Sequence, residues 1–94
     1  MNSDVILDEA IALTAEHWKR ADADGSIPNN LNLRDRVTLF APMMRALLLA
    51  RWPQLRAADD QVILLVVAEG IARSGSIARD KLEAALGIIL PPDL

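Results

Sequence analysis

The sequence predicts an all-α fold, a compact bundle of about four helices in one domain spanning residues 1–94. Three observations favour this fold. Apolar residues recur at the spacing of an amphipathic helix, and clusters of turn-forming residues separate the periodic stretches. The one run rich in β-branched residues has no second run with which it could form a sheet. A chain of 94 residues that is 52% hydrophobic is also large enough to build one core.

The first predicted helix begins near Ser3 and ends near Asp24. At about 100° per residue, His17 and most apolar side chains fall on one side of this helix, and most charged side chains fall on the other. Residues 21–30 supply the glycine, asparagines and proline of a turn, so the helix should end there.

The second predicted helix covers residues 33–52, with Asn32 as its N-terminal cap. Pro42 lies in the middle of this segment and would normally break a helix, but it falls on the side opposite the main apolar face. That face comprises Val37, Phe40, Met44, Leu47 and Leu48. A single helix kinked at Pro42 is therefore favoured over two short helices. The helix should end where Trp52 precedes Pro53.

Two further helices are predicted in the second half of the chain. The third covers residues 60–73, with Asp59 or Asp60 as its cap. Its run VILLVV would also suit a buried strand, but a strand needs a partner and the chain offers none. The fourth covers about residues 77–86, with Ser76 as its cap and a glycine at its end.

The composition excludes several classes of function. The chain has no cysteine, which excludes disulfides, thiolate nucleophiles and thiolate zinc sites. Its net charge of −3 gives no overall attraction to nucleic acid or to anionic membranes. The longest uncharged apolar stretch, residues 62–68, is far shorter than the roughly 20 residues of a membrane span. We therefore expect neither a nucleic-acid partner nor a membrane anchor.

The origin and location of the protein are also predicted from the sequence. The N-terminal segment carries acidic residues where a secretory signal would carry basic ones, so we expect a cytoplasmic protein. Arginine outnumbers lysine eight to two and alanine is abundant, a bias typical of a GC-rich bacterial coding sequence.

His17 is the single histidine and the first candidate for chemistry. A metal site would need further ligands at a spacing of three or four residues on the same helix face, and none is present. A general base would need a matching nucleophile, which is also missing. The sequence favours a buried neutral histidine bonded to a carbonyl or to Thr14, with a pH-sensitive interface as the functional alternative. A small-molecule binder around His17 and Trp18 is a further hypothesis.

Residues 22–27 resemble part of an EF-hand calcium loop, with Gly25 at the position of its glycine. The resemblance ends there. The first ligand position would be Arg20, and the final bidentate glutamate would be Leu31. An acidic helix exit is therefore favoured over a calcium site, and we expect no metal and no other cofactor.

The hairpin over residues 60–87 resembles helix–turn–helix material, which gives a transcriptional regulator as the alternative function. With the turn at residues 74–76, the second helix would have to read DNA. That helix carries two basic and two acidic side chains, namely Arg79, Lys81, Asp80 and Glu83. Its balanced charge favours an ordinary helical hairpin.

The predicted core does not account for all of the apolar residues on the second and third helices. The four that remain, as candidates for an interface, are Leu49, Trp52, Val62 and Leu65. A domain of this size cannot fully surround two such apolar helices, so a partner would cover the rest. The leading hypothesis is a non-enzymatic interaction module of the adaptor, inhibitor or immunity type. It would form a homodimer or bind another protein through these apolar helix faces.

Overall fold

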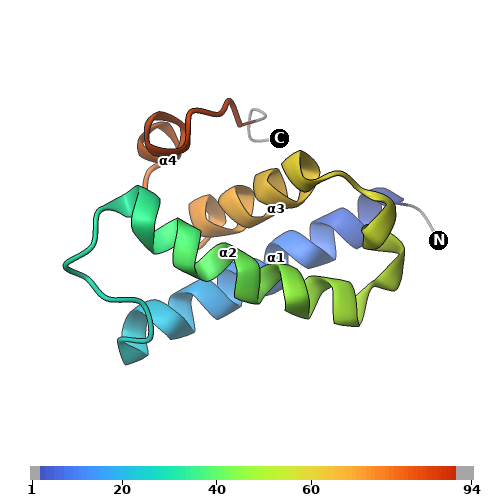
Figure 1. Cartoon of the computed structure of the whole chain (residues 1–94), viewed down its shortest axis with the longest axis horizontal. Helices are drawn as coiled ribbons and strands as arrows, with labels where there is room; N and C mark the ends of the chain where they lie inside the picture. Colours follow the sequence, from blue (N-terminus) through green and yellow to red (C-terminus); the bar gives the residue numbers. More distant parts are fainter. Residues whose placement is uncertain (1–2, 91–94) are drawn as a thin grey trace.

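A computed structural model describes residues 3–90 and shows an all-helical chain (Figure 1). The α-helices are α1 (Ser3–Asp24), α2 (Leu33–Arg51), α3 (Asp60–Arg73) and α4 (Arg79–Leu86). A short 3-10 helix, η1 (Pro53–Ala57), connects α2 to α3 between the second and third predicted helices. The described residues contain no strand, so the all-α prediction is confirmed and the strand alternative for VILLVV is wrong.

Two of the predicted caps explain why α2 and α3 begin where they do. The Asn32 side chain accepts a hydrogen bond from the Asp35 N–H at 2.9 Å. The Asp59 side chain accepts one from the Val62 N–H at 3.1 Å, which decides between the two aspartates proposed for that position. Each cap supplies a side-chain acceptor to an N–H of the first turn, where no carbonyl four residues earlier belongs to the helix. The Val62 N–H also donates to the Asp59 carbonyl at 3.1 Å.

The second helix is continuous through Pro42, as the sequence favoured. Pro42 is exposed, and the buried residues of α2 lie on another face, namely Val37, Phe40, Met44 and Leu48. The helix ends at Arg51, where the Trp52 N–H donates to the Leu48 carbonyl, and Pro53 begins η1.

Helices α1 and α3 lie side by side and make one very close contact (Figure 1). It occurs at Gly70, where an added Cβ would lie only 2.5 Å from both Cβ and Cγ2 of Thr14. Thr14 is fully buried, and its hydroxyl donates to the Ala10 carbonyl at 2.7 Å. A residue without a side chain is therefore required at this crossing.

Trp18 connects α1 to two other parts of the fold. Its fully buried ring meets Phe40 of α2 edge to face, with 5.1 Å between the ring centroids. Its indole N–H donates to the Ser76 hydroxyl at 3.0 Å. The prediction that Ser76 caps the last helix is wrong: α4 begins at Arg79, and no side chain caps it at Ala78. The Ser76 hydroxyl instead accepts the hydrogen bond from the Trp18 indole.

Replacing Ser76 with alanine should lower the free energy of unfolding by about 1–2 kcal/mol, because the buried Trp18 N–H would lose its acceptor. Urea denaturation followed by circular dichroism measures this loss. In a Trp18→Phe background the same substitution should cost much less, since no N–H remains to be satisfied. An equal cost in both backgrounds would show that the hydrogen bond contributes nothing.

The chain after α4 returns to the core. Gly87 ends the helix in the left-handed conformation, with φ of 65°. The Leu90 N–H then donates to a carboxylate oxygen of Glu83 at 2.8 Å, and the Leu90 side chain is buried. Among the described residues, no helix is both long enough and apolar enough to cross a membrane.

Candidate protein interaction surface

An exposed apolar row follows the outer side of α2. Its large side chains Leu39, Met43 and Leu47 are 53%, 55% and 46% exposed. They are spaced four residues apart, so they lie on one side of the helix. Continuing the spacing in both directions reaches the exposed residues Asp35 and Arg51. We call these five residues the α2 row. It presents an apolar centre with an acidic group at one end and a basic group at the other.

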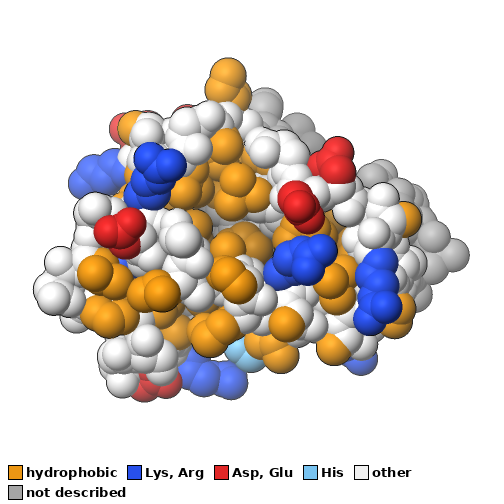
Figure 2. Space-filling model, viewed as in Figure 1, with side chains coloured by type: hydrophobic (Ala, Val, Ile, Leu, Met, Phe, Trp, Pro, Cys, Tyr) orange, Lys and Arg blue, Asp and Glu red, His pale blue; other side chains and the backbone are white. Residues whose placement is uncertain are grey.

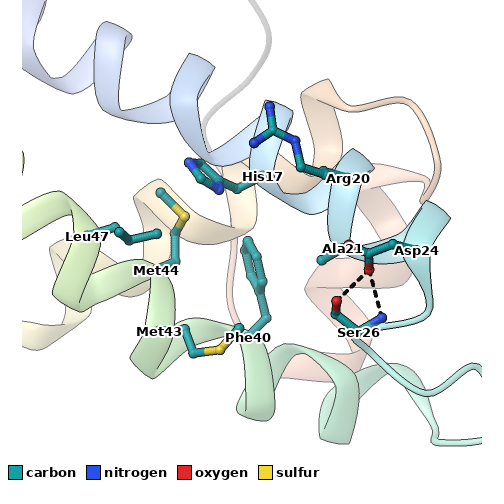
Figure 3. Close-up of a pocket in the computed structure, with 9 residues that line it drawn as sticks. All are labelled: His17, Arg20, Ala21, Asp24, Ser26, Phe40, Met43, Met44 and Leu47. Atoms are coloured by element: carbon teal, nitrogen blue, oxygen red, sulfur yellow. Dashed lines mark hydrogen bonds between the residues drawn. The ribbon is translucent and has the colours of Figure 1, made fainter.

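A shallow pocket of about 190 Å³ lies beside the α2 row, between α1 and α2 (Figure 3). Its lining residues are His17, Arg20, Ala21, Asp24, Ser26, Phe40, Met43, Met44 and Leu47. Figure 3 shows that α2 supplies apolar side chains to this pocket, whereas α1 supplies the imidazole and a guanidinium. The pocket therefore extends the apolar surface of the row toward His17.

His17 is half-buried at the edge of this pocket rather than enclosed in the core. Among residues 3–90 no group hydrogen-bonds its imidazole, and the Thr14 hydroxyl is occupied by the Ala10 carbonyl. The expectation of a buried histidine bonded to a carbonyl or to Thr14 is thus wrong. Figure 2 shows the histidine (pale blue) at the surface among hydrophobic side chains. A pH-sensitive role for His17 at an interface stays a prediction.

Two of the four predicted interface residues belong largely to the core. Trp52 is only 8% exposed, and Leu49 is partly buried against the same core. The sequence predicted that both lie outside the core. The difference arises because η1 folds back on α2 and brings its own buried residue, Leu55, to this end of the helix.

The other two predicted residues, Val62 and Leu65, line a groove of about 200 Å³ between α1 and α3. The remaining lining residues are Leu7, Ile11, Val66 and Glu69. Val62 and Leu65 are partly buried, and the groove includes neither Leu49 nor Trp52. The structure therefore divides the four candidate residues between two places.

The α2 row is the surface that sequence reasoning missed. The helical pattern predicts Leu47 on the buried face and gives Leu39 and Met43 no separate role. The signal was present in the sequence as apolar residues four apart, flanked at the same spacing by Asp35 and Arg51. A helix as apolar as α2 carries more large side chains than one face can bury.

A network of charged side chains ties α3 to α1 and α4. The two outer nitrogens of Arg79 donate to the two carboxylate oxygens of Glu69, each at 2.6 Å. Glu69 is 8% exposed. Arg73 lies 3.7 Å from Glu69 and donates to Asp8 of α1 at 3.0 Å. Arg73 and Arg79 are basic residues that a DNA-reading hairpin would need, and both are paired with carboxylates of their own chain, which weakens that alternative.

The acidic turn after α1 is occupied by bonds within the chain. Asp24 accepts hydrogen bonds from the Ser26 hydroxyl and from the Ser26 N–H, and these two bonds lower the pKa of the Asp24 carboxyl. Gly25 takes the left-handed conformation that the turn requires, with φ of 77°. Asp22 forms an ion pair with Arg36 of α2. The segment is the helix exit that the sequence favoured, and residues 3–90 bring no three metal-ligating side chains together.

Comparisons with known protein families, with curated proteins and with solved structures found no match to this chain.

Proposed function

We propose that this protein is a small, non-enzymatic interaction module that associates with a second copy of itself through the α2 row. The observation that carries the proposal is the exposure of Leu39, Met43 and Leu47 on one side of α2. Removing apolar surface from water contributes roughly 25 cal/mol per Å². A partner that covers this row would therefore gain stability from each of the three side chains.

A second copy is the occupant that the charges favour. Each copy carries both an acidic and a basic group on the row, Asp35 and Arg51, so each can complement the other. The small exposed residues Ala46 and Ala50 lie beside the row and let another helix approach. The row is small beside the roughly 1,200 Å² of total area that stable interfaces bury, so we expect a weak, concentration-dependent dimer.

The non-enzymatic part of the proposal rests on the sequence. The chain lacks cysteine, and its single histidine has no ligand set or nucleophile spaced to work with it. The proposed setting, a bacterial cytoplasm, rests on the composition described above.

Sedimentation equilibrium over a wide concentration range tests the proposal. The wild-type chain, of 10.3 kDa, should approach twice that mass as its concentration rises. Met43→Glu should remain a monomer, because it places a charge at the centre of the row. Ile89→Glu is the matched control: Ile89 is 87% exposed and lies outside the row, so this variant should still dimerise. A wild-type chain that stays monomeric at the highest attainable concentration would refute self-association.

A further inference from the structure

We infer that the two copies pair α2 against α2 in antiparallel orientation, about a two-fold axis beside Met43. This inference rests on the proposed self-association and specifies its geometry. The α2 row has Met43 at its centre, with leucines four residues away on both sides. Asp35 lies eight residues before Met43 and Arg51 lies eight residues after it. The apolar part of the row therefore reads the same from either end of the helix. Its two ends carry opposite charges, negative at Asp35 and positive at Arg51.

Antiparallel pairing brings opposite charges together at both ends. Eight residues of helix span about 12 Å, so each charged group lies about that far from the axis. With Met43 facing Met43 of the second copy, Leu39 faces Leu47 and Asp35 faces Arg51. Parallel pairing would instead place Asp35 against Asp35 and Arg51 against Arg51, which is repulsive at both ends. The charges therefore select the antiparallel arrangement.

The charged ends of the row are accessible in a single copy. Both Asp35 and Arg51 are exposed, and within residues 3–90 neither forms an ion pair. The Arg51 guanidinium carbon lies 5.6 Å from the centroid of the neighbouring Trp52 ring. Such a cation–π contact uses the charge of the guanidinium and not its N–H donors.

The surroundings of the row also permit close packing of two helices. Ala46 and Ala50 present only methyl groups beside it, which suits close packing of two helices. Rows of residues four apart lie along each other when the helices cross at about −50°, with axes about 8–10 Å apart. Pro42 lines a different groove, toward α3, and so does not obstruct this side of α2. Figure 2 shows hydrophobic side chains gathered over α2 around the single histidine.

Cysteine cross-linking tests the orientation directly, because the chain contains no cysteine of its own. Under mild oxidation, Met43→Cys should form a disulfide-linked dimer. Leu39→Cys and Leu47→Cys should cross-link to each other when mixed but far less when each is alone. In antiparallel pairing each copy of residue 39 lies four residues, or about 6 Å, from the axis. The two copies are therefore about 12 Å apart along the helix direction, whereas a disulfide needs Cα atoms within about 7 Å. Ile89→Cys, on a more exposed side chain, is the control for random collision.

Charge reversal gives an independent test. Asp35→Arg and Arg51→Asp should each raise the dissociation constant of the dimer about tenfold, because each creates two like-charge contacts. The double variant should return to the wild-type value. Arg34→Asp reverses a charge in the same turn but off the row, so it should change the dissociation constant little.

The outcomes separate this inference from the proposed function. Self-cross-linking of Leu39→Cys in preference to the mixture would overturn the antiparallel geometry. A second result is that the wild-type chain dimerises while neither charge reversal changes its dissociation constant and no cysteine in the row forms a cross-link. That result would overturn the pairing of α2 with α2 and leave self-association in place. A monomeric wild-type chain would remove both.

Discussion

Replacing Arg79 with methionine should lower the free energy of unfolding by about 3 kcal/mol. Arg79 donates two hydrogen bonds of 2.6 Å to Glu69, a carboxylate that the fold buries between helices. Methionine keeps much of the apolar stem of arginine but removes the charge. Glu69 would then keep Arg73 at 3.7 Å as its nearest cation, and much of its desolvation would be uncompensated. Urea denaturation at neutral pH measures the loss.

Two companion variants show whether burial is the reason. Arg73→Met removes the pair with Asp8 and the longer contact with Glu69. The side chains of Arg73 and Asp8 are 40% and 70% exposed, so this variant should cost less than about 1 kcal/mol. Replacing Glu69 with leucine together with Arg79→Met removes both charges and should recover most of the loss. If Arg73→Met proves as costly as Arg79→Met, the buried position of Glu69 is not what makes its ion pair important.

Replacing Gly70 with alanine should lower the free energy of unfolding by about 2 kcal/mol. The new Cβ would lie 2.5 Å from two carbons of Thr14 and 3.0 Å from the Ile11 carbonyl oxygen, so α1 and α3 would have to separate. In an exposed helix the same change would stabilise by up to about 1 kcal/mol, because alanine favours helix over glycine. The steric cost at this crossing must therefore exceed that gain. Thermal and urea denaturation both report the net effect.

A substitution on the opposite helix should relieve this clash. Both carbons at 2.5 Å belong to the Thr14 side chain, so only Thr14→Gly removes them. The double variant Gly70→Ala with Thr14→Gly should be less destabilised than the sum of the two single variants. Strict additivity of the two losses would mean that the side chains do not meet at this crossing.

Local chemistry explains which parts of the fold could be predicted from the sequence. Asn32 caps α2 through an N–H three residues away, and Asp59 caps α3 in the same manner. Such signals lie within one helical turn and are visible in the sequence. Ser76 shows where this reasoning fails, because the group that takes its hydroxyl is the indole of Trp18, 58 residues away. The residues that neighbour Ser76 in the sequence give no indication of that partner.

The candidate surface was harder to predict than the helices. A helical wheel assigns each side chain of α2 to a side but does not say which sides other elements cover. Leu47 and Leu48 are neighbours in the sequence, yet Leu48 is fully buried whereas Leu47 is nearly half exposed. The decisive factor is how α1, α3 and η1 are placed around α2, which depends on contacts distant in the sequence. The same reason explains why Trp52, which the sequence predicts at an interface, is buried.

The positions of the two tryptophans have a practical consequence for spectroscopy. Trp18 lies against Phe40 between α1 and α2, whereas Trp52 lies at the C-terminal cap of α2, where η1 begins. Both rings are buried, so the emission of each should shift to longer wavelength when water reaches it. Variants that retain only one tryptophan would therefore follow two regions of the molecule separately, and coincident transitions would show that these regions unfold as one cooperative unit.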